Sequence, residues 1–302
     1  MISRRRSAGR RWARRGSFAA VAAAAALAQA GCPGTETRSE PDACVQAQAL
    51  SAAPIFGTSL GPKELALTFD DGPGSRTLEL SAYLKAQGIR AAFFVNGHCF
   101  QVGNGCGNNN PTRTAAQVLA QLVADGHLVA NHTQTHPNLT QLPATPAGDT
   151  AMVNELALTD AVIAPYVQNG RFLFRAPFGA YNQRTYDVLH ASAMDKYVGH
   201  IEWDVGGART ATTAADWACW QQNPKLTSAQ CGDLYRTEID AVGKGIILFH
   251  DADYGNAGNT NPNAGTGNTV DMVKTMVPLL KAAGYTFKRV DDTAVPVTDD
   301  LT

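Results

Sequence analysis

The sequence has little charge, and several patterns that mark common protein classes are missing from it. Charged residues make up 17% of the 302 residues and hydrophobic residues 44%, so the chain can bury a sizeable core and does not have a disordered composition. It contains neither of the common glycine-rich phosphate loops, so nothing in it points to nucleotide chemistry. It also lacks a Cys-x-x-Cys pair, which argues against a zinc site built from cysteines.

Basic residues are scarce once the N-terminal segment is set aside. Residues 1–31 hold seven arginines and no acid, and without them 18 basic residues stand against 26 acidic ones, a net charge of −8. Proteins that bind nucleic acid need basic surfaces to neutralise phosphates. This acidic balance argues against a nucleic-acid partner.

The first 31 residues have the pattern of a signal peptide. A basic stretch precedes an apolar run, Phe18–Ala28, that is too short to span a bilayer. The sequence Leu27–Cys32 then resembles a bacterial lipoprotein cleavage box, which predicts a lipid on Cys32, with simple cleavage nearby as the alternative. We therefore expect export to the cell envelope, either secreted or lipid-anchored, with membrane attachment only through that lipid.

The remaining chain divides into three parts by composition. Residues 32–56 are rich in Pro, Thr, Glu and Ala without a period, which is typical of a flexible tether. Residues 57–296 are predicted to form one folded domain, and residues 297–302 a short tail. We expect the protein to be a monomer.

The six cysteines fit an oxidising compartment. Closeness in sequence favours two disulfides, Cys99–Cys106 and Cys219–Cys231, among 15 possible pairings. Cys44 is left without an obvious partner if Cys32 carries a lipid.

Apolar runs typical of strands alternate with helical patterns along the domain. This alternation predicts a parallel sheet with helical crossovers, and we expect an α/β fold, a distorted or incomplete (β/α) barrel with about seven parallel strands. A doubly wound open sheet is the alternative. The predicted strands are 65–70, 91–95, 127–130, 172–174, 197–203, 246–249 and 285–290. The predicted helices are 77–87, 115–125, 150–167, 182–190, 235–242 and 270–283. The last of them is expected to face the core with Met272, Val273, Met276, Leu279 and Leu280.

Polar side chains follow two of the first three predicted strands. Asp70 and Asp71 end the first strand, and Gly72-Pro73 turns the chain after them. His132 and His136 follow the third strand at a spacing that lets two imidazoles share one metal ion with a carboxylate. Each pair alone also fits an ordinary solvated turn or loop. Their common position at strand ends favours a site, because an α/β enzyme places its chemistry there.

The fourth, fifth and sixth predicted strands also end in polar residues, Arg175, Asp204 and His250. An arginine beside the Asp pair would hold one carboxylate ionised and oriented. A histidine at a strand end can donate a proton, since its pKa lies near neutrality. Taken together, the strand ends indicate a metal-dependent hydrolase with an Asp base and a His acid.

These segments resemble the motifs of the polysaccharide deacetylases of carbohydrate esterase family four, which share the nodulation-deacetylase homology domain. Thr68–Pro73 matches the first motif, His132–His136 the second, Arg175–Gly179 the third and Leu248–His250 the fifth. The resemblance covers about residues 60–290. It implies that residues 57–296 are a polysaccharide deacetylase catalytic domain.

The resemblance implies a metal site and a general base. Asp71, His132 and His136 would bind the metal, usually Zn2+ in this family, with Co2+ or another divalent transition metal as the alternative. Asp70 would take a proton from the attacking water, whose pKa the metal lowers. Arg175 would orient Asp70.

The resemblance also assigns the groups around the acetyl carbonyl. A backbone N–H near Phe178 would hold the oxyanion together with the metal. His250 would protonate the leaving amine or alcohol. Leu248 and Trp203 would shape the slot for the acetyl methyl group, although core packing alone also explains a Trp at that position.

The fourth motif departs from the family pattern. The family has two acids closely followed by Trp, whereas here Asp204 follows Trp203, and Asp216-Trp217 comes only after a stretch of Gly, Ala and Thr. We assign Asp204 to tuning His250 or bracing Arg175. Asp216-Trp217 either completes the motif or supports the loop between Cys219 and Cys231.

The expected substrate is an acetylated polysaccharide. We favour N-deacetylation of N-acetylglucosamine units in chitin, chitooligosaccharides or peptidoglycan. The alternative is O-deacetylation of acetylated xylan by the same residues, and a lower-ranked alternative is a carbohydrate-binding protein without catalysis. A metal-dependent amidase acting on a peptide or small cyclic amide is a further possibility, by analogy of fold only.

Overall fold

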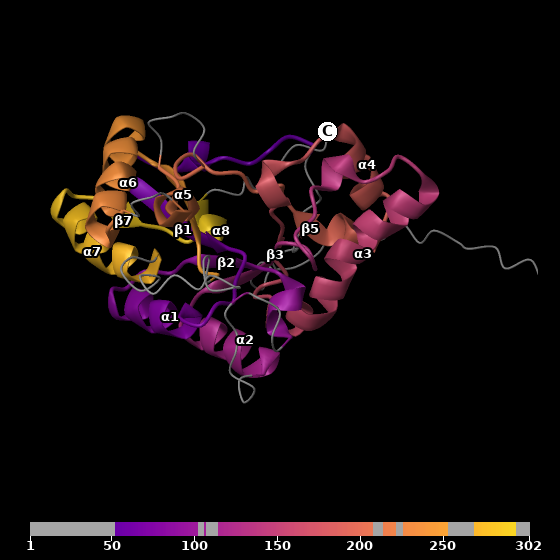
Figure 1. The fold of residues 1–302 in the computed structure, drawn as a ribbon, viewed down its shortest axis with the longest axis horizontal. Helices are drawn as coiled ribbons and strands as arrows, with labels where there is room; N and C mark the ends of the chain where they lie inside the picture. The colour runs from indigo at the N-terminus through magenta and orange to yellow at the C-terminus, as the bar shows by residue number, and fades with distance from the viewer. Residues whose placement is uncertain are drawn as a thin grey trace, which may run out of the picture. The chain divides into compact units, whose positions relative to one another are not determined.

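The structure is a computed structural model that describes residues 52–101, 106, 114–207, 214–221, 226–252 and 269–293. The predicted signal peptide, Cys32, Cys44, most of the tether and the tail lie outside these residues. Figure 1 shows the strands in the middle of the described domain, with helices around them. Among the helices that are described, none has the length and apolarity needed to cross a membrane.

The main sheet is parallel and has β1 (Glu64–Asp70) at its centre. Its strands follow the order β3 (Leu128–Asn131), β2 (Ala92–Val95), β1 and β6 (Gly245–His250), and β7 (Thr286–Phe287) pairs with the beginning of β1. The register of β1 and β6 sets Asp70 directly opposite His250. The carboxyl ends of β1, β2, β3 and β6 therefore lie at one edge of the sheet.

A second, two-stranded sheet completes most of a ring. It pairs β4 (Phe172–Leu173) with β5 (Tyr197–Val198), again in parallel. Single bridges connect it to the main sheet, Asn131 to Phe174 on one side and Val205 to Ile247 on the other. The predicted incomplete barrel with seven parallel strands is confirmed.

Side chains on alternate positions of the strands enter two different cores, as a barrel requires. Leu65, Leu67 and Phe69 of β1 pack outward under the helices, whereas Ala66 packs inward in a second cluster that also contains Phe94. All residues of β1 after Glu64 are buried, because helices cover one face and the barrel interior covers the other. Thr68 and Asp70 follow the inward alternation of Ala66, which directs them into the barrel.

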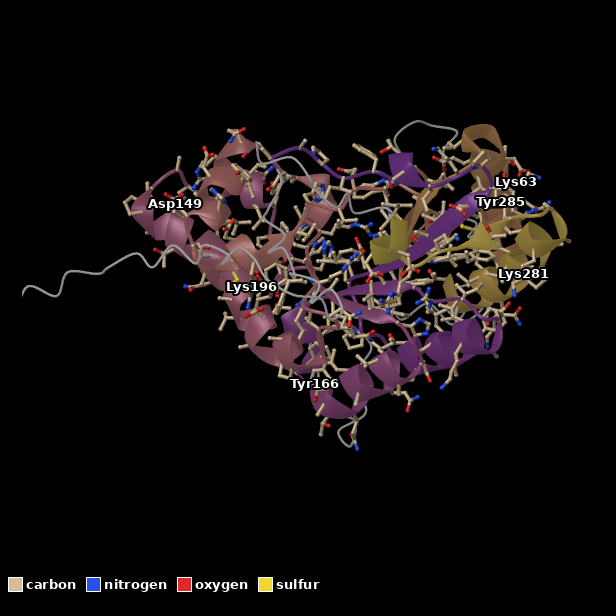
Figure 2. The ribbon with its side chains drawn as sticks, turned by 180° about the vertical axis from the view of Figure 1, so that it is seen from behind. Lys63, Asp149, Tyr166, Lys196, Lys281 and Tyr285 are labelled. Carbon is tan, nitrogen blue, oxygen red and sulfur yellow. A yellow bond between two sulfur atoms is a disulfide. The ribbon has the colours of Figure 1, made fainter. Side chains whose placement is uncertain are left out.

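Helices surround the strands in two groups. The first group contains α1 (Thr77–Ala86), α2 (Ala115–Ala124), α6 (Ser228–Val242) and α7 (Thr269–Ala282), in which α2 contacts α1, α1 contacts α7 and α7 contacts α6 (Figure 1). The second pairs α3 (Pro146–Ile163) with α4 (Gln183–His190). Two short helices, α5 (Asp216–Gln221) and α8 (Val290–Thr293), were not predicted. At the far end of β1, Lys63 lies over the ring of Tyr285, with 5.4 Å between its Nζ and the ring centroid (Figure 2).

Two local expectations are corrected by the structure. The strand predicted for 197–203 ends at Val198, because Gly199 has a φ of 133° and the chain leaves the strand there. Residues 200–202 still join the barrel through backbone hydrogen bonds, among them Ile201 N to Phe174 O at 2.9 Å. Leu279, expected to face inward on α7, is 42% exposed, while Leu280 beside it is buried.

Candidate active site

The polar residues predicted at the strand ends meet in one cavity. Its volume is about 470 Å3, and it opens at the edge where β1 and β6 end. Its lining consists of Asp70, Asp71, His132, His136, Phe178, Trp203, Gly207, Trp217, Leu248 and His250. Parallel pairing explains the convergence, since it brings the carboxyl ends of separate strands to the same edge.

Asp71, His132 and His136 form a cluster with the chemistry of a metal site. Asp71 Oδ1 lies 3.2 Å from His132 Nε2 and 3.1 Å from His136 Nε2, and one ligand atom from each residue falls within 4.8 Å of the others. Ligands at 2.0–2.2 Å around a tetrahedral zinc lie about 3.3 Å from one another, close to these separations. Asp71 Oδ1 is buried and has no hydrogen-bond donor. A divalent cation fits this orphaned oxygen and the two imidazole nitrogens beside it.

The backbone holds this cluster in uncommon conformations. Asp71 has a φ of 68°, Thr133 of 72° and His136 of 60°, all in the left-handed region that non-glycine residues rarely adopt. Asn131 accepts a hydrogen bond from Thr133 N at 2.9 Å, and Thr133 Oγ1 accepts one from His136 N at 3.1 Å. These bonds fix the turn after β3, so that both imidazoles face Asp71.

Hydrogen bonding fixes which nitrogen of His132 faces the cluster. Its Nδ1 lies 2.8 Å from the carbonyl oxygen of Arg175, which can only accept, so Nδ1 carries the proton. In the neutral imidazole the lone pair is then on Nε2, the nitrogen nearer to Asp71, which is the form that a metal-binding histidine needs. Although burial alone would raise the pKa of Asp71, its contacts with His132 and His136 hold that pKa well below its usual range.

Arg175 is fully buried and holds Asp70. Its Nη1 donates to Asp70 Oδ1 at 2.7 Å and to Thr68 Oγ1 at 2.9 Å. The carbonyls of Ile201 and Glu202 accept its remaining bonds, from Nε at 2.8 Å and Nη2 at 3.2 Å. The guanidinium is thus held on several sides, and its bond to Asp70 aims that carboxylate at the cavity.

His250 is paired with Asp216, the first residue of α5. His250 Nδ1 lies 2.7 Å from Asp216 Oδ1, and His250 N donates to Asp216 Oδ2 at 2.7 Å. Burial alone would lower the pKa of His250, but the carboxylate of Asp216, with smaller contributions from Asp71 and Asp70, raises the pKa to about 9. The imidazole is therefore protonated at neutral pH.

The structure places Asp204 elsewhere and thereby corrects its predicted role. Asp204 Oδ2 accepts hydrogen bonds from Gly57 N at 2.9 Å and Ile246 N at 2.7 Å, at the beginning of β6. His250 lies at the other end of that strand, about 13 Å away at 3.3 Å per residue. The acid that tunes His250 is Asp216, and the carbonyls of residues 201 and 202 brace Arg175.

Apolar and aromatic side chains form the walls of the cavity. Leu248 and Trp203 are buried and line the cavity, as does Phe178, which is 66% exposed. Phe178 has a φ of 62°, and its ring contacts His136 edge-on, with 4.5 Å between ring centroids. Trp217 of α5, which is 37% exposed, forms a further wall. From the sequence, Asp216-Trp217 could either complete the fourth motif or support the loop between Cys219 and Cys231.

His200 and Glu202 were not predicted as site residues, yet they support the third motif. His200 Nδ1 accepts a hydrogen bond from Ala176 N at 3.0 Å, and its Nε2 lies 2.9 Å from Glu202 Oε2. Burial lowers the pKa of His200, and the adjacent Glu202 opposes this effect. The turn at Pro177–Gly179 is therefore anchored from behind. No motif marks this pair, so only the fold reveals it.

The two predicted disulfides are confirmed. Cys99 is bonded to Cys106 near the metal cluster, and Cys219 to Cys231 between α5 and α6. His98 lies close to the first disulfide, but disulfide sulfurs carry no thiolate to bind a metal.

A serine-hydrolase site does not fit the structure. The segment Gly57–Gly61 matches the pattern Gly-x-Ser-x-Gly, but a nucleophile elbow requires a turn from a strand into a helix. Here Gly57–Ser59 is a short 3-10 helix that precedes β1, and Ser59 is exposed. The chemistry therefore belongs to the cavity at the strand ends.

Comparison with known proteins agrees with this geometry. The family model described as polysaccharide deacetylase matches residues 57–196. A chitooligosaccharide deacetylase of Bradyrhizobium sp. (strain ANU 289) is 27% identical over 233 residues, 76% of this chain and 90% of the relative. A bifunctional xylanase/deacetylase of Pseudobutyrivibrio xylanivorans is 26% identical over 257 residues, 83% of this chain but 35% of the relative.

Solved structures show the same fold. The chitin deacetylase from the fungal pathogen Colletotrichum lindemuthianum superposes with a TM-score of 0.55 at 22% identity, over 79% of this chain and 89% of that one. The matched family, the shared fold and the cavity lined by four of the family's motifs agree with one another. The chain is similar to the hydrolases of the polysaccharide deacetylase family in sequence over residues 57–196 and in fold.

Proposed function

We propose that the protein removes acetyl groups from a polysaccharide by metal-dependent hydrolysis, and that its substrate contains N-acetylglucosamine units. The main support for the proposal is that two titratable side chains, each held by a charged partner, face one cavity. Asp70 is held by Arg175 at 2.7 Å, and His250 is held by Asp216 at 2.7 Å. A base and an acid that are each held in place by a charged partner suit the hydrolysis of an amide.

Each residue has a role in the proposed reaction. Asp70 takes a proton from water as the water oxygen forms a bond to the acetyl carbonyl carbon. The backbone N–H of Phe178 holds the negative oxygen that results. His250 then gives its Nε2 proton to the leaving nitrogen as the carbon–nitrogen bond breaks, which yields acetate and a free amine.

The cluster of Asp71, His132 and His136 would hold the metal, and Zn2+ suits its nitrogen and oxygen donors. When bound, a divalent ion supplies Lewis acidity to the carbonyl and lowers the pKa of the attacking water. Leu248 and Trp203 close the end of the cavity with apolar surface, which suits the acetyl methyl group.

Release of acetate tests the proposal. The protein would be loaded with zinc or stripped by a chelator and offered chitooligosaccharides, peptidoglycan and acetylated xylan. Zinc-dependent release from the amino-sugar substrates supports N-deacetylation. No release from any substrate by protein that holds metal contradicts the proposal and favours a carbohydrate-binding protein without catalysis.

O-deacetylation of xylan is the second candidate, because a relative similar over 83% of this chain is named xylanase/deacetylase. The same base and acid serve an ester, and only the leaving group changes from nitrogen to oxygen. Release of acetate from acetylated xylan alone decides for this candidate.

A further inference from the structure

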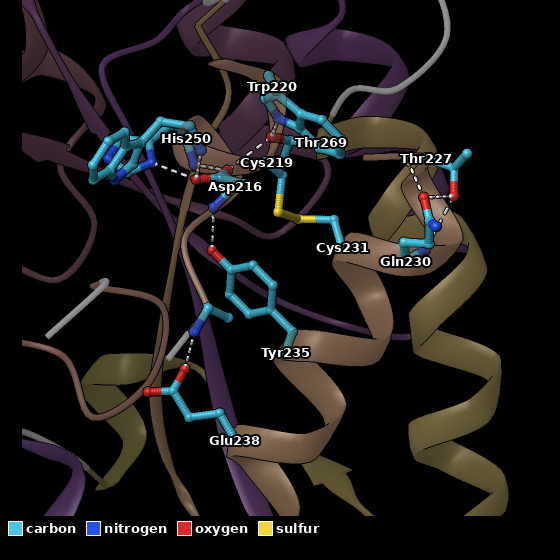
Figure 3. The surroundings of a disulfide bond; sticks show 12 residues. Asp216, Cys219, Trp220, Thr227, Gln230, Cys231, Tyr235, Glu238, His250 and Thr269 are labelled. Carbon is cyan, nitrogen blue, oxygen red and sulfur yellow. Dashed lines mark hydrogen bonds and ion pairs between the residues drawn. A yellow bond between two sulfur atoms is a disulfide. The ribbon is translucent and has the colours of Figure 1, made fainter. Parts of the chain in front are cut away.

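One face of α6 points its side chains at α5. Cys231, Tyr235 and Glu238 follow one another at spacings of four and three residues, which places them on the same side of a helix. Figure 3 shows all three reaching the segment that contains α5. Their contacts are the disulfide to Cys219, a hydrogen bond from Asp216 N to Tyr235 Oη at 3.0 Å, and one from Ala214 N to Glu238 Oε2 at 2.7 Å.

The helix held in this way is too short to keep its own orientation. α5 spans Asp216–Gln221, and a helix of this length is not stable in isolation. Its first residue is the partner of His250, and its second, Trp217, is a wall of the cavity. The attachment of α5 to α6 therefore decides where both side chains lie.

Tyr235 connects α5 directly to the strand of the acid. Its hydroxyl accepts from Asp216 N and donates to the carbonyl of Leu248 at 3.0 Å, two residues before His250. Tyr235, Asp216 and Cys231 are all fully buried. A loss of this hydroxyl would leave a buried N–H and a buried carbonyl without their shared partner.

Asp216 is also held by a residue of α7. Thr269, the first residue of α7, donates from Oγ1 to Asp216 Oδ2 at 2.8 Å and accepts from Trp220 Nε1 at 3.3 Å (Figure 3). The carboxylate of Asp216 thus has a fixed direction, and its Oδ1 faces the imidazole of His250. The metal cluster lies on β1 and the turn after β3, away from these contacts.

We propose that Cys231, Tyr235 and Glu238 are positioning residues for the catalytic acid, and that the Cys219–Cys231 disulfide is needed to hold Asp216 against His250. The inference rests on the proposed function, because it takes His250 as the acid. It implies that proton donation depends on an oxidised Cys219–Cys231 pair, whereas metal binding does not.

Two matched pairs of variants test this inference. The double variant Cys219→Ser/Cys231→Ser is compared with Cys99→Ser/Cys106→Ser, which removes the other disulfide. Tyr235→Phe is compared with Tyr285→Phe, which removes a buried hydroxyl bonded instead to Asp240 at 2.9 Å. The readouts are the titration of His250 by NMR in metal-free protein, the metal content, and kcat and KM for acetate release.

Loss of the Cys219–Cys231 bond is expected to lower the His250 midpoint by at least about one pH unit and kcat by about tenfold or more, with metal content unchanged. KM should rise by no more than the several-fold expected when the Trp217 wall is lost. Tyr235→Phe is expected to lower kcat by about three- to tenfold, the range that one hydrogen bond supplies. Loss of the other disulfide should leave the His250 midpoint in place, and Tyr285→Phe should change neither quantity.

A folded Cys219→Ser/Cys231→Ser protein with an unchanged midpoint and kcat would overturn the inference. If that variant does not fold, the comparison of Tyr235→Phe with Tyr285→Phe decides, and equal behaviour of the two refutes it. Failure of the proposed function looks different. The unaltered protein would then release no acetate from any substrate. The His250 midpoint would still show, by its change or lack of change on loss of the bond, whether the disulfide holds Asp216 against His250.

Discussion

Replacement of Asp216 by Asn should change the titration of His250 more than any other single substitution in the cavity. The carboxylate of Asp216 is the main group that raises the pKa of His250 to about 9, against an ordinary value of 6.5, and it does so although burial acts in the opposite direction. Without this charge we expect the pKa of His250 to fall to 6.5 or below. Each pKa unit corresponds to 1.36 kcal/mol, so the pair contributes on the order of 3 kcal/mol.

NMR titration of His250 in metal-free protein measures this change directly. Asp204→Asn is the matched control, since Asp204 bonds backbone N–H groups at the beginning of β6 and should leave the His250 midpoint near its original value. A midpoint that stays near 9 in Asp216→Asn would show that the neighbouring carboxylates Asp70 and Asp71, and not Asp216, set the charge of the acid.

The same pair predicts how stability changes with pH. Because the pKa of His250 is higher in the folded protein than in the unfolded chain, the stabilisation is complete below pH 6.5 and is lost as the pH rises through about 9. The free energy of unfolding of the metal-free protein should therefore fall across this interval by a few kcal/mol, on the order of 3. Asp216→Asn should largely remove this decline in urea titrations.

Three further substitutions separate the roles of the cavity residues. Asp70→Asn should retain bound zinc, but its rate of acetate release should fall by a factor of about 10² or more. His132→Ala should lose both the metal and the activity, and metal analysis and turnover measured on one sample check both variants. Full turnover in Asp70→Asn would contradict the assignment of Asp70 as the base. A lysine in place of Arg175 cannot reproduce the contacts made by Nε, Nη1 and Nη2. Arg175→Lys should therefore lower the free energy of unfolding by about 3–5 kcal/mol and leave Asp70 poorly oriented. A loss below about 1 kcal/mol in chemical denaturation would show that the buried pair is not needed for stability. Trp217→Ala removes a wall of the cavity without touching either charge pair, so KM should rise several-fold while the His250 midpoint stays constant; an unchanged KM would place the sugar elsewhere.

The sequence was sufficient for residues that lie directly at a strand end. Asp70, Asp71 and His250 follow apolar runs whose length and alternation mark strands, and parallel pairing then brings them together. The positions of His132 and His136 could be predicted for the same reason, because their turn follows β3 without interruption.

The roles of residues that lie on the crossover connections between strands could not be predicted in this way. Asp204 is near the end of the predicted fifth strand, so it looked like a site residue. The strand ends at Val198, however, and the chain that follows stays in the barrel wall without regular strand structure and places Asp204 at the beginning of β6. Asp216 lies on a short helix whose position depends on a disulfide and on α6. Its contact with His250 joins residues 34 positions apart, a distance over which no local period gives information.

The pairing of β1 with β6 also determines how early during synthesis the domain can fold. Thr68 Oγ1 donates to Ile247 O across 179 residues of chain, so the ladder closes one of the largest loops in the domain. Until residues 245–250 have been synthesised, the edge of β1 that pairs with β6 has no partner strand, and an unpaired edge can pair with strands of other chains. The chain therefore has to remain uncollapsed, or be shielded, until nearly all of it is available. The strand that brings His250 is also the one that protects the centre of the sheet from aggregation, and a truncation before it should produce insoluble protein instead of an inactive domain.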